Sequence, residues 1–225
     1  MLYSQYVEML SNNRIDMQQH LSSHTIIQGL TTPKKIQDYL DAIPFNHEKN
    51  GETFRSAHEV VTHKEAHCLE GAFLACAALA SHKRKPMIVS LKVQSLDFDH
   101  IITIFKEGSY FGAISKTNHA VLRWRDPIYR NVRELVMSYF HEYFLTSTGK
   151  KTLLGYTRPI NLTRFGTSWI TSSEPQCMIA YAIADTPFVS IIPKENKKYV
   201  RNATLLERKA ASLSSKKEIP KETFL

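Results

Sequence analysis

The chain has 225 residues, of which 43% are hydrophobic, and a formal net charge of +8 at pH 7. This length fits one globular domain with a substantial core, whereas a second complete domain would be cramped. Residues 194–225 hold nine Lys or Arg and four Glu, which is a net +5 of the total +8. The rest of the chain is only mildly basic, so we expect no specific nucleic-acid partner.

Cysteine usage and hydropathy indicate a soluble protein of a reducing compartment. The three cysteines include no C-x-x-C pair, so they do not form a disulfide framework. No stretch approaches the roughly 20 apolar residues of a membrane span, and the start lacks a basic region followed by an apolar core. We therefore expect a cytoplasmic location and no membrane partner, while the oligomeric state stays open.

The first part of the chain carries signals for helices. Residues 1–30 mix polar and scattered apolar side chains and predict a helix that packs on the outside of the domain. Thr32 can cap free N–H groups and Pro33 suits the first helical position, so a helix begins there and ends before Pro44. Ser56 opens a second, short helix through a capping box.

A helix of small and apolar residues follows, from Cys68 to about Ser81. Its apolar positions recur at intervals of three and four, which is the helical period, and its Gly and Ala residues allow close approach of another element. We expect this helix to lie in the middle of the domain. The apolar positions are Leu69, Ala72, Phe73, Cys76 and Leu79.

Strand signals come next. Residues 87–93 are rich in β-branched residues with partial alternation, and they predict a strand. Two apolar runs, 100–105 and 110–115, flank a Glu-Gly-Ser turn and predict an antiparallel hairpin. A helix followed by consecutive antiparallel strands is typical of the α+β class.

Signals in the second half are sparser. A helix is expected over residues 131–144, and short strands are expected over 178–183 and 188–192. The resulting organisation is a single α+β domain with an N-terminal helical segment over residues 1–193, followed by a basic polar C-terminal tail over residues 194–225.

Cys68 is the candidate nucleophile. A cysteine in the first turn of a helix faces the partial positive charge of unpaired N–H groups, and this charge favours the thiolate over the thiol. Cys76 lies two turns deeper on nearly the same side of the helix, where we expect packing only.

A nucleophilic cysteine needs a base and a group that orients the base. His100, at the start of the first hairpin strand, is the candidate base. Ser115 and Asn118, where the returning strand ends, are the candidate orienting groups. Carboxylates on neighbouring loops are further candidates for this third role, namely Asp97, Asp99 and Asp126.

This order of residues resembles the transglutaminase-like superfamily, and most closely its bacterial branch of transglutaminase-like cysteine proteases. The similarity covers residues 32–144. The downstream segments 125–129 and 138–140 also resemble that bacterial branch. The positions that match the family pattern are Cys68, Ala72, Leu79, Pro86, His100, Gly108 and Phe111.

The resemblance implies a papain-like fold in which a central helix, bearing the cysteine at its N-terminus, packs on an antiparallel sheet. It also implies cysteine-dependent acyl transfer or hydrolysis at the amide bond of a protein or peptide substrate, as peptidase, amidase or transglutaminase, with no cofactor and no metal. The family commonly has an Asp shortly after the aromatic strand, where this chain has Ser115 and then Asn118.

Two other functions fit the same residues. A protein-binding module could keep this fold after losing the carboxylate. A zinc-binding protein could use His58, His63, His67 and Cys68, although their spacing matches none of the usual zinc-finger signatures.

Overall fold

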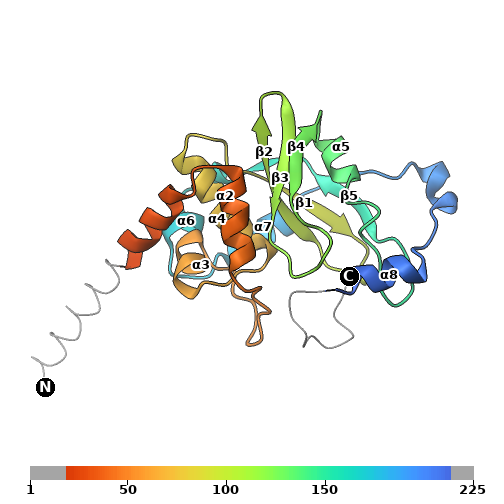
Figure 1. Ribbon diagram of the computed structural model, residues 1–225, viewed down its shortest axis with the longest axis horizontal. Helices are drawn as coiled ribbons and strands as arrows, with labels where there is room; N and C mark the ends of the chain where they lie inside the picture. The colour runs from red at the N-terminus through yellow and green to blue at the C-terminus, as the bar shows by residue number, and fades with distance from the viewer. Residues whose placement is uncertain (1–18, 214–225) are drawn as a thin grey trace, which may run out of the picture.

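The structure is a computed structural model and describes residues 19–213. Helices pack on a seven-stranded antiparallel sheet, which confirms the predicted α+β class. The strand order is β4-β3-β2-β1-β5-β7. The short strand β6 pairs with the first two residues of β1, Met87 and Ile88, antiparallel to it. In Figure 1 the helices α2, α3, α4 and α6 gather on one side of the sheet and α5 lies on the other.

The bounds of the strands are β1 Met87–Val93, β2 His100–Glu107, β3 Tyr110–Ser115, β4 Arg125–Tyr129, β5 Leu153–Thr157, β6 Ile160–Asn161 and β7 Phe188–Ser190. Residues 19–29 are helical. The helices that follow are α2 Pro33–Ala42, α3 Ala57–His63, α4 Cys68–Ser81, α5 Val132–Met137, η1 Leu162–Phe165, α6 Ser168–Thr171, α7 Cys177–Ala184, η2 Lys194–Tyr199 and α8 Leu205–Ala211.

The central helix is α4, as the sequence predicts. Every residue from Leu69 to Leu79 is buried, because α4 lies between the other helices and the sheet. Thr103 of β2 donates to the carbonyl of Ala72 at 3.3 Å, which ties the middle of the helix to the strand beneath it. The small residues of α4 permit this close approach.

The sheet separates two hydrophobic clusters because side chains of a strand alternate between its faces. On β2, Ile101 and Phe105 belong to the cluster around α4, whereas Ile102 and Ile104 face the other cluster. That second cluster includes Leu135 of α5 together with residues from the segment that follows it.

The predicted hairpin of β2 and β3 is confirmed, with Glu107 paired to Tyr110 across the turn. At the other end Ser115 pairs with Ile102. His100 lies two residues before Ile102, so His100 and Ser115 share one face of the sheet as diagonal neighbours. The sequence alone predicts Ser115 directly opposite His100, and the observed register differs by two residues.

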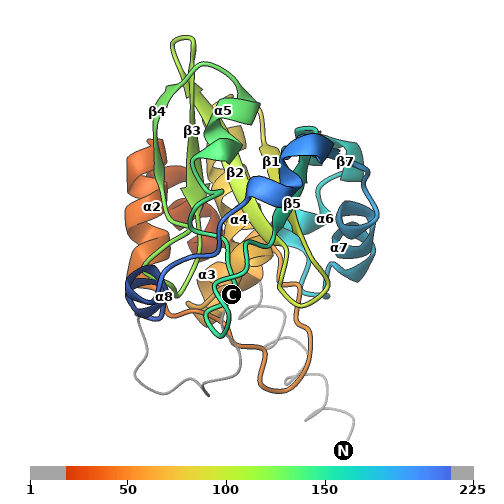
Figure 2. The same cartoon turned by 90° about the vertical axis from the view of Figure 1, so that its right-hand side faces the viewer.

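One predicted strand of the second half is wrong, whereas the strand predicted over 188–192 is found as β7. The segment 178–183 is helical, within α7, because its buried residues Ile179, Ala180 and Ile183 follow helical spacing. Short apolar runs do not distinguish a strand from a buried helix by pattern alone. Strands β4 and β5 were not expected, and Figure 2 shows β5 beside β7 with α6 and α7 at the same end of the molecule.

The helix expected over 131–144 is shorter, since α5 ends at Met137. Arg125 explains the early end: its guanidinium donates to the hydroxyl and the carbonyl of Ser138, at 2.9 and 3.3 Å. It also lies 4.0 Å from the centre of the Tyr139 ring and forms an ion pair with Glu142 at 2.7 Å. Beyond Met137 the backbone continues in tighter turns, in which the N–H groups of Tyr139 and Phe140 donate to the carbonyls three residues earlier.

Residues 194–213 do not form the solvated tail that the sequence predicts, because part of this segment packs on the domain. It forms η2 and α8, and Ala203 and Ala211 are buried in the second cluster. The N–H of Ala203 donates to the carbonyl of Gly149 at 2.7 Å. Small alanines give little hydrophobic signal in a lysine-rich sequence, although they fit closely against a surface. Within residues 19–213, no helix has the length and apolar composition needed to cross a bilayer.

Gly71 marks a close approach between α4 and the loop after β3. A Cβ atom at this position would lie 2.5 Å from the Cβ of Lys116. Lys116 has little freedom to move away, because its ammonium group donates to the carbonyls of Leu40 and Ile43 at 2.7 and 2.6 Å. We expect Gly71→Ala to destabilise the protein by about 1–3 kcal/mol, measured by urea unfolding.

Gly29→Ala is the matched control. Gly29 is also helical, and a Cβ there would meet nothing within 4 Å. We expect this substitution to be neutral or to stabilise the protein by up to about 1 kcal/mol. Equal effects of the two substitutions would show that the contact between Gly71 and Lys116 is not tight.

Candidate active site

Cys68 is the first residue of α4, at the N-terminal end of the helix, where the sequence places it. His67 is the N-cap residue: its Nδ1 accepts a hydrogen bond from the N–H of Leu69 at 3.2 Å. Glu70 completes the capping box by accepting from the N–H of His67 at 2.9 Å. The side chains of His67 and Glu70 therefore fix the geometry of the helix N-terminus at which the Cys68 thiol lies. Cys68 is partly buried and free of any disulfide.

His100 and Ser115 are in direct contact. His100 Nε2 lies 2.7 Å from Ser115 Oγ, and Ser115 Oγ donates to the carbonyl of Leu122 at 2.5 Å. A serine hydroxyl has one proton, so it accepts from His100 while it donates to Leu122. The proton of a neutral His100 ring is therefore on Nε2, and Nδ1 is left as the basic nitrogen.

Gln37 of α2 fixes the backbone of Ser115. Its amide donates to the Ser115 carbonyl and accepts from the Ser115 N–H, both at 2.9 Å. The Gln37 amide thus bonds both backbone groups of Ser115, as a neighbouring strand would do. The sequence gives no sign of this role, because nothing in the local pattern around Gln37 points to a residue 78 positions away.

The environment of Cys68 favours its thiolate. Burial alone would raise the pKa of the thiol, but hydrogen bonds with His100 and with His67, and the charges of both rings, lower it to about 5. Cys76 is the contrast within the same helix: burial raises its pKa to about 12, with Thr103 as its hydrogen-bond partner. The two thiols of α4 thus differ because only Cys68 faces imidazole rings.

The other candidates for the orienting group are placed elsewhere. Asn118 is buried, and among the hydrogen bonds of the described residues none joins its side chain to His100. Asp97 accepts from Thr152 at 2.5 Å and Asp99 pairs with Lys92 at 2.6 Å. The last carboxylate considered, Asp126, accepts from the indole N–H of Trp124 at 2.8 Å.

The histidines considered for zinc do not converge. His58 stacks on His20 with ring centres 3.7 Å apart and lies 2.6 Å from the hydroxyl of Ser23. His63 pairs with Glu59, at 3.1 Å, on the exposed side of α3. Of the proposed zinc ligands, only His67 lies beside Cys68.

A different group of possible metal ligands surrounds His67, because its donor atom and those of Glu48 and Glu70 lie within 4.8 Å of one another. Their hydrogen bonds do not fit a metal. His67 Nδ1 accepts from a backbone N–H, so Nε2 carries the ring proton, and this Nε2 faces carboxylate oxygens of Glu48 and Glu70 at 3.4 and 3.5 Å. A metal needs the lone pair of that nitrogen.

The lone pairs of Glu70 are also committed. Its side chain is fully buried and accepts hydrogen bonds from Asn46, Thr53, the N–H of Arg55 and the N–H of His67. Burial would raise the pKa of this carboxyl, but the charge of His67 and these hydrogen bonds lower it. Glu70 therefore anchors the loop 46–55 to the first turn of α4.

That loop brings Phe54 to the site. Phe54 has a φ of 41°, a left-handed conformation that is strained for a bulky residue. Its ring meets the His67 ring edge-on, with centres 6.2 Å apart, and the Tyr181 ring of α7 at 6.0 Å. The carbonyl of Phe54 accepts from the N–H of Gln176 at 2.8 Å, just before α7. The loop thus joins the surroundings of Cys68 to α7.

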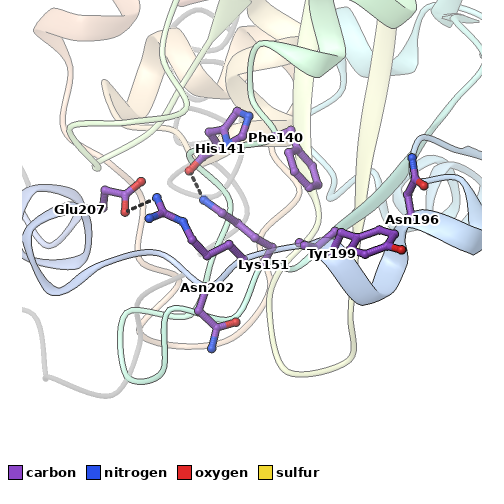
Figure 3. Close-up of a pocket in the computed structure, with 9 residues that line it drawn as sticks. Phe140, His141, Lys151, Asn196, Tyr199, Asn202 and Glu207 are labelled. Atoms are coloured by element: carbon purple, nitrogen blue, oxygen red, sulfur yellow. Dashed lines mark hydrogen bonds and ion pairs between the residues drawn. The ribbon is translucent and has the colours of Figure 1, made fainter.

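A hollow of about 430 Å³ lies between the segment after α5 and the C-terminal segment. Figure 3 shows the side chains that line it, including Phe140, Tyr199 and Lys151. Lys151 donates to the carbonyl of His141 at 2.7 Å, and Glu207 pairs with Arg201 at 3.8 Å, so its charged groups have partners. None of the lining residues is a candidate of the Cys68 site.

Comparison with protein-family models and with curated proteins finds no match for this chain.

Proposed function

We propose that this chain catalyses cysteine-dependent acyl transfer at an amide bond, with Cys68 as nucleophile, His100 as base and Ser115 as the orienting group. One arrangement carries the proposal: Cys68 lies at the N-terminus of α4, where His100 and His67 lower the pKa of its thiol to about 5, and a serine hydroxyl lies 2.7 Å from Nε2 of His100. Perturbed groups of this kind cluster at functional sites.

The first step forms an acyl-enzyme. Nδ1 of His100 takes the proton of the Cys68 thiol, and the thiolate attacks the carbonyl carbon of the amide. The N–H of Cys68 is at the first helical position, where it has no partner within the helix, so it is available to the oxyanion. The C–N bond then breaks as His100 returns the proton to the leaving amine, and a thioester remains on Cys68.

The second step releases the acyl group. His100 removes a proton from an incoming nucleophile, which attacks the thioester carbonyl and expels the Cys68 thiolate. Water gives hydrolysis, as in a peptidase or amidase, and a primary amine gives transamidation. Each pathway restores the free enzyme with the proton balance unchanged.

The surroundings suit a peptide or protein substrate with an apolar side chain near the reacting amide. Phe54 links the site to α7, whose exposed face carries Met178 and Tyr181, 81% and 51% exposed. The ring centres of His67 and Tyr181 lie 6.2 and 6.0 Å from that of Phe54, so their separation is at most about the length of four residues of extended chain. The order of α4, β1, β2 and β3 likewise supports a papain-like, transglutaminase-like arrangement.

The rival function is a binding module on the same fold. It is favoured by one observation: the group that contacts His100 is the hydroxyl of Ser115, whereas Asp97, Asp99 and Asp126 have other partners. A hydroxyl fixes the tautomer of a histidine but stabilises an imidazolium less than a carboxylate does.

Alkylation of the purified protein with iodoacetamide tests the proposal. The rate of modification at Cys68, followed by mass spectrometry across pH 4–9, should rise with a midpoint near 5 because the thiolate is the reacting form. Cys76 should remain unmodified, and Cys68→Ala should remove the low-pH reaction. A Cys68 midpoint near the roughly 8.5 of a free thiol would leave the binding module as the better reading.

A further inference from the structure

A chain of hydrogen bonds runs from His100 through Ser115 and Leu122 to Glu142, a carboxylate that the proposed mechanism does not use. We infer that Glu142 is a positioning residue of the candidate active site: it holds Leu122 in the strained conformation that directs the Leu122 carbonyl to Ser115, and it thereby fixes the tautomer of His100. The catalytic consequence of this inference rests on the proposed role of His100 as base.

Leu122 is the strained residue of this chain of bonds. Its φ is 60°, a left-handed conformation that a bulky side chain rarely adopts, and its side chain is buried in the second hydrophobic cluster. Both of its backbone groups are bonded: the carbonyl accepts from Ser115 Oγ at 2.5 Å, and the N–H donates to Glu142 Oε2 at 2.8 Å. Strained residues persist where the surrounding contacts over-determine them, and they cluster at functional sites.

Glu142 is itself fixed from its other side. Its second carboxylate oxygen, Oε1, pairs with the guanidinium of Arg125 at 2.7 Å. Arg125 also donates to the hydroxyl of Ser138 at 2.9 Å and lies 4.0 Å from the centre of the Tyr139 ring. The ion pair therefore leaves one carboxylate oxygen for the N–H of Leu122, and loss of the carboxylate would leave the N–H of a buried residue without this acceptor.

The carbonyl of Leu122 decides the direction of the Ser115 proton. While that carbonyl accepts, Ser115 Oγ offers a lone pair to His100 Nε2, and the neutral ring carries its proton there. If Leu122 relaxes, the hydroxyl can instead donate to His100 Nε2, and the ring proton then moves to Nδ1, the nitrogen that the proposed mechanism uses as base. Gln37 cannot replace Glu142 in this role, because it bonds the backbone of Ser115 and not the hydroxyl.

NMR of protein labelled with ¹⁵N-histidine reads this tautomer directly. The measurement uses the Cys68→Ala protein at mildly alkaline pH, so that no thiolate holds a second proton on the ring, and the His100 signals are those missing from a His100→Ala protein. We expect the proton on Nε2 alone, and we expect the Nδ1–H form to appear when Glu142→Ala is added. Glu107→Ala is the matched control and should change nothing, because Glu107 lies at the other end of β2 and pairs with Arg84, also at 2.7 Å.

Alkylation by iodoacetamide is the second readout, in proteins that keep Cys68. Glu142→Ala should raise the pH midpoint of Cys68 modification, by less than His100→Ala does, because the ring remains but presents its basic nitrogen to the thiol for only part of the time. Glu107→Ala should leave the midpoint unchanged.

The outcomes separate the positioning role from the proposed function. A His100 tautomer that is the same with and without Glu142→Ala would overturn the inference. If that variant does not fold, Glu142→Gln decides by the same criterion, since its amide offers one oxygen where the carboxylate offers two to Leu122 and Arg125. A tautomer that depends on Glu142, in a protein whose Cys68 midpoint lies in the free-thiol range, would support the positioning role and overturn the nucleophile instead.

Discussion

Replacing His100 with Ala should raise the alkylation midpoint of Cys68 by two pH units or more. Burial opposes ionisation of this thiol, and the hydrogen bond with His100 is the strongest influence that lowers its pKa to about 5. A nearby opposite charge shifts a pKa by roughly 1–3 units, so its removal returns the thiol toward its ordinary range. Any amide turnover should fall by about 10²–10⁴-fold in kcat, because general base catalysis is lost.

Two further variants identify the orienting group. Ser115→Ala removes the acceptor of His100 Nε2, so the ring samples both tautomers and turnover should fall by at least about tenfold. Asn118→Ala is the matched control, because its side chain makes no hydrogen bond to His100 among the described residues, and it should leave the alkylation profile unchanged. If Asn118→Ala shifted the alkylation profile while Ser115→Ala left turnover unchanged, the assignment of Ser115 as the orienting group would be refuted.

Replacing Glu70 with Ala should destabilise the protein by about 3–5 kcal/mol, measured by urea unfolding. The substitution leaves Asn46, Thr53 and the N–H of Arg55 without their acceptor in a buried site. It also removes half of the capping box of α4. Loss of the anchored loop should lower the reactivity of Cys68 in the same variant.

Glu65→Ala is the surface control for Glu70. Glu65 pairs with Arg55 at 2.9 Å and its side chain is 37% exposed, so the expected cost is below about 1 kcal/mol. Equal costs for Glu70→Ala and Glu65→Ala would show that Glu70 does not anchor the loop.

The stability that Glu70 contributes should also depend on pH. Because the pKa of Glu70 is lower in the folded protein than its unfolded value near 4.5, its contribution to the free energy of unfolding is present above that unfolded pKa and is lost as pH falls through the folded pKa.

Sequence determined the elements whose signals are local. The cap and proline at Thr32 and Pro33 place the start of α2, and the three-four spacing after Cys68 gives α4. Strand β1 and the hairpin of β2 and β3 follow from β-branched runs and a short turn. Local periodicity and turn chemistry act over a few residues, so one sequence contains them in full.

The same local signals made Cys68 and His100 candidates for nucleophile and base, and left Ser115 and Asn118 as alternatives for the orienting group. Register brings Ser115 to His100: Ser115 pairs with Ile102, which puts it on the same face as His100, and its hydroxyl is within hydrogen-bond distance of the ring. Register depends on how every strand of a sheet fits its neighbours, and a short turn does not fix it alone.

Contacts between distant segments were decided by the tertiary structure alone. Gln37 meets Ser115 across 78 residues, and Glu70 gathers a loop that ends fifteen residues before it. Polar residues at such positions look like ordinary surface residues in a sequence, since nothing local shows that they will be buried. The structure buries Gln37 against Ser115 and Glu70 in the first turn of α4, and there the free energy of an unpaired polar group makes each partner necessary.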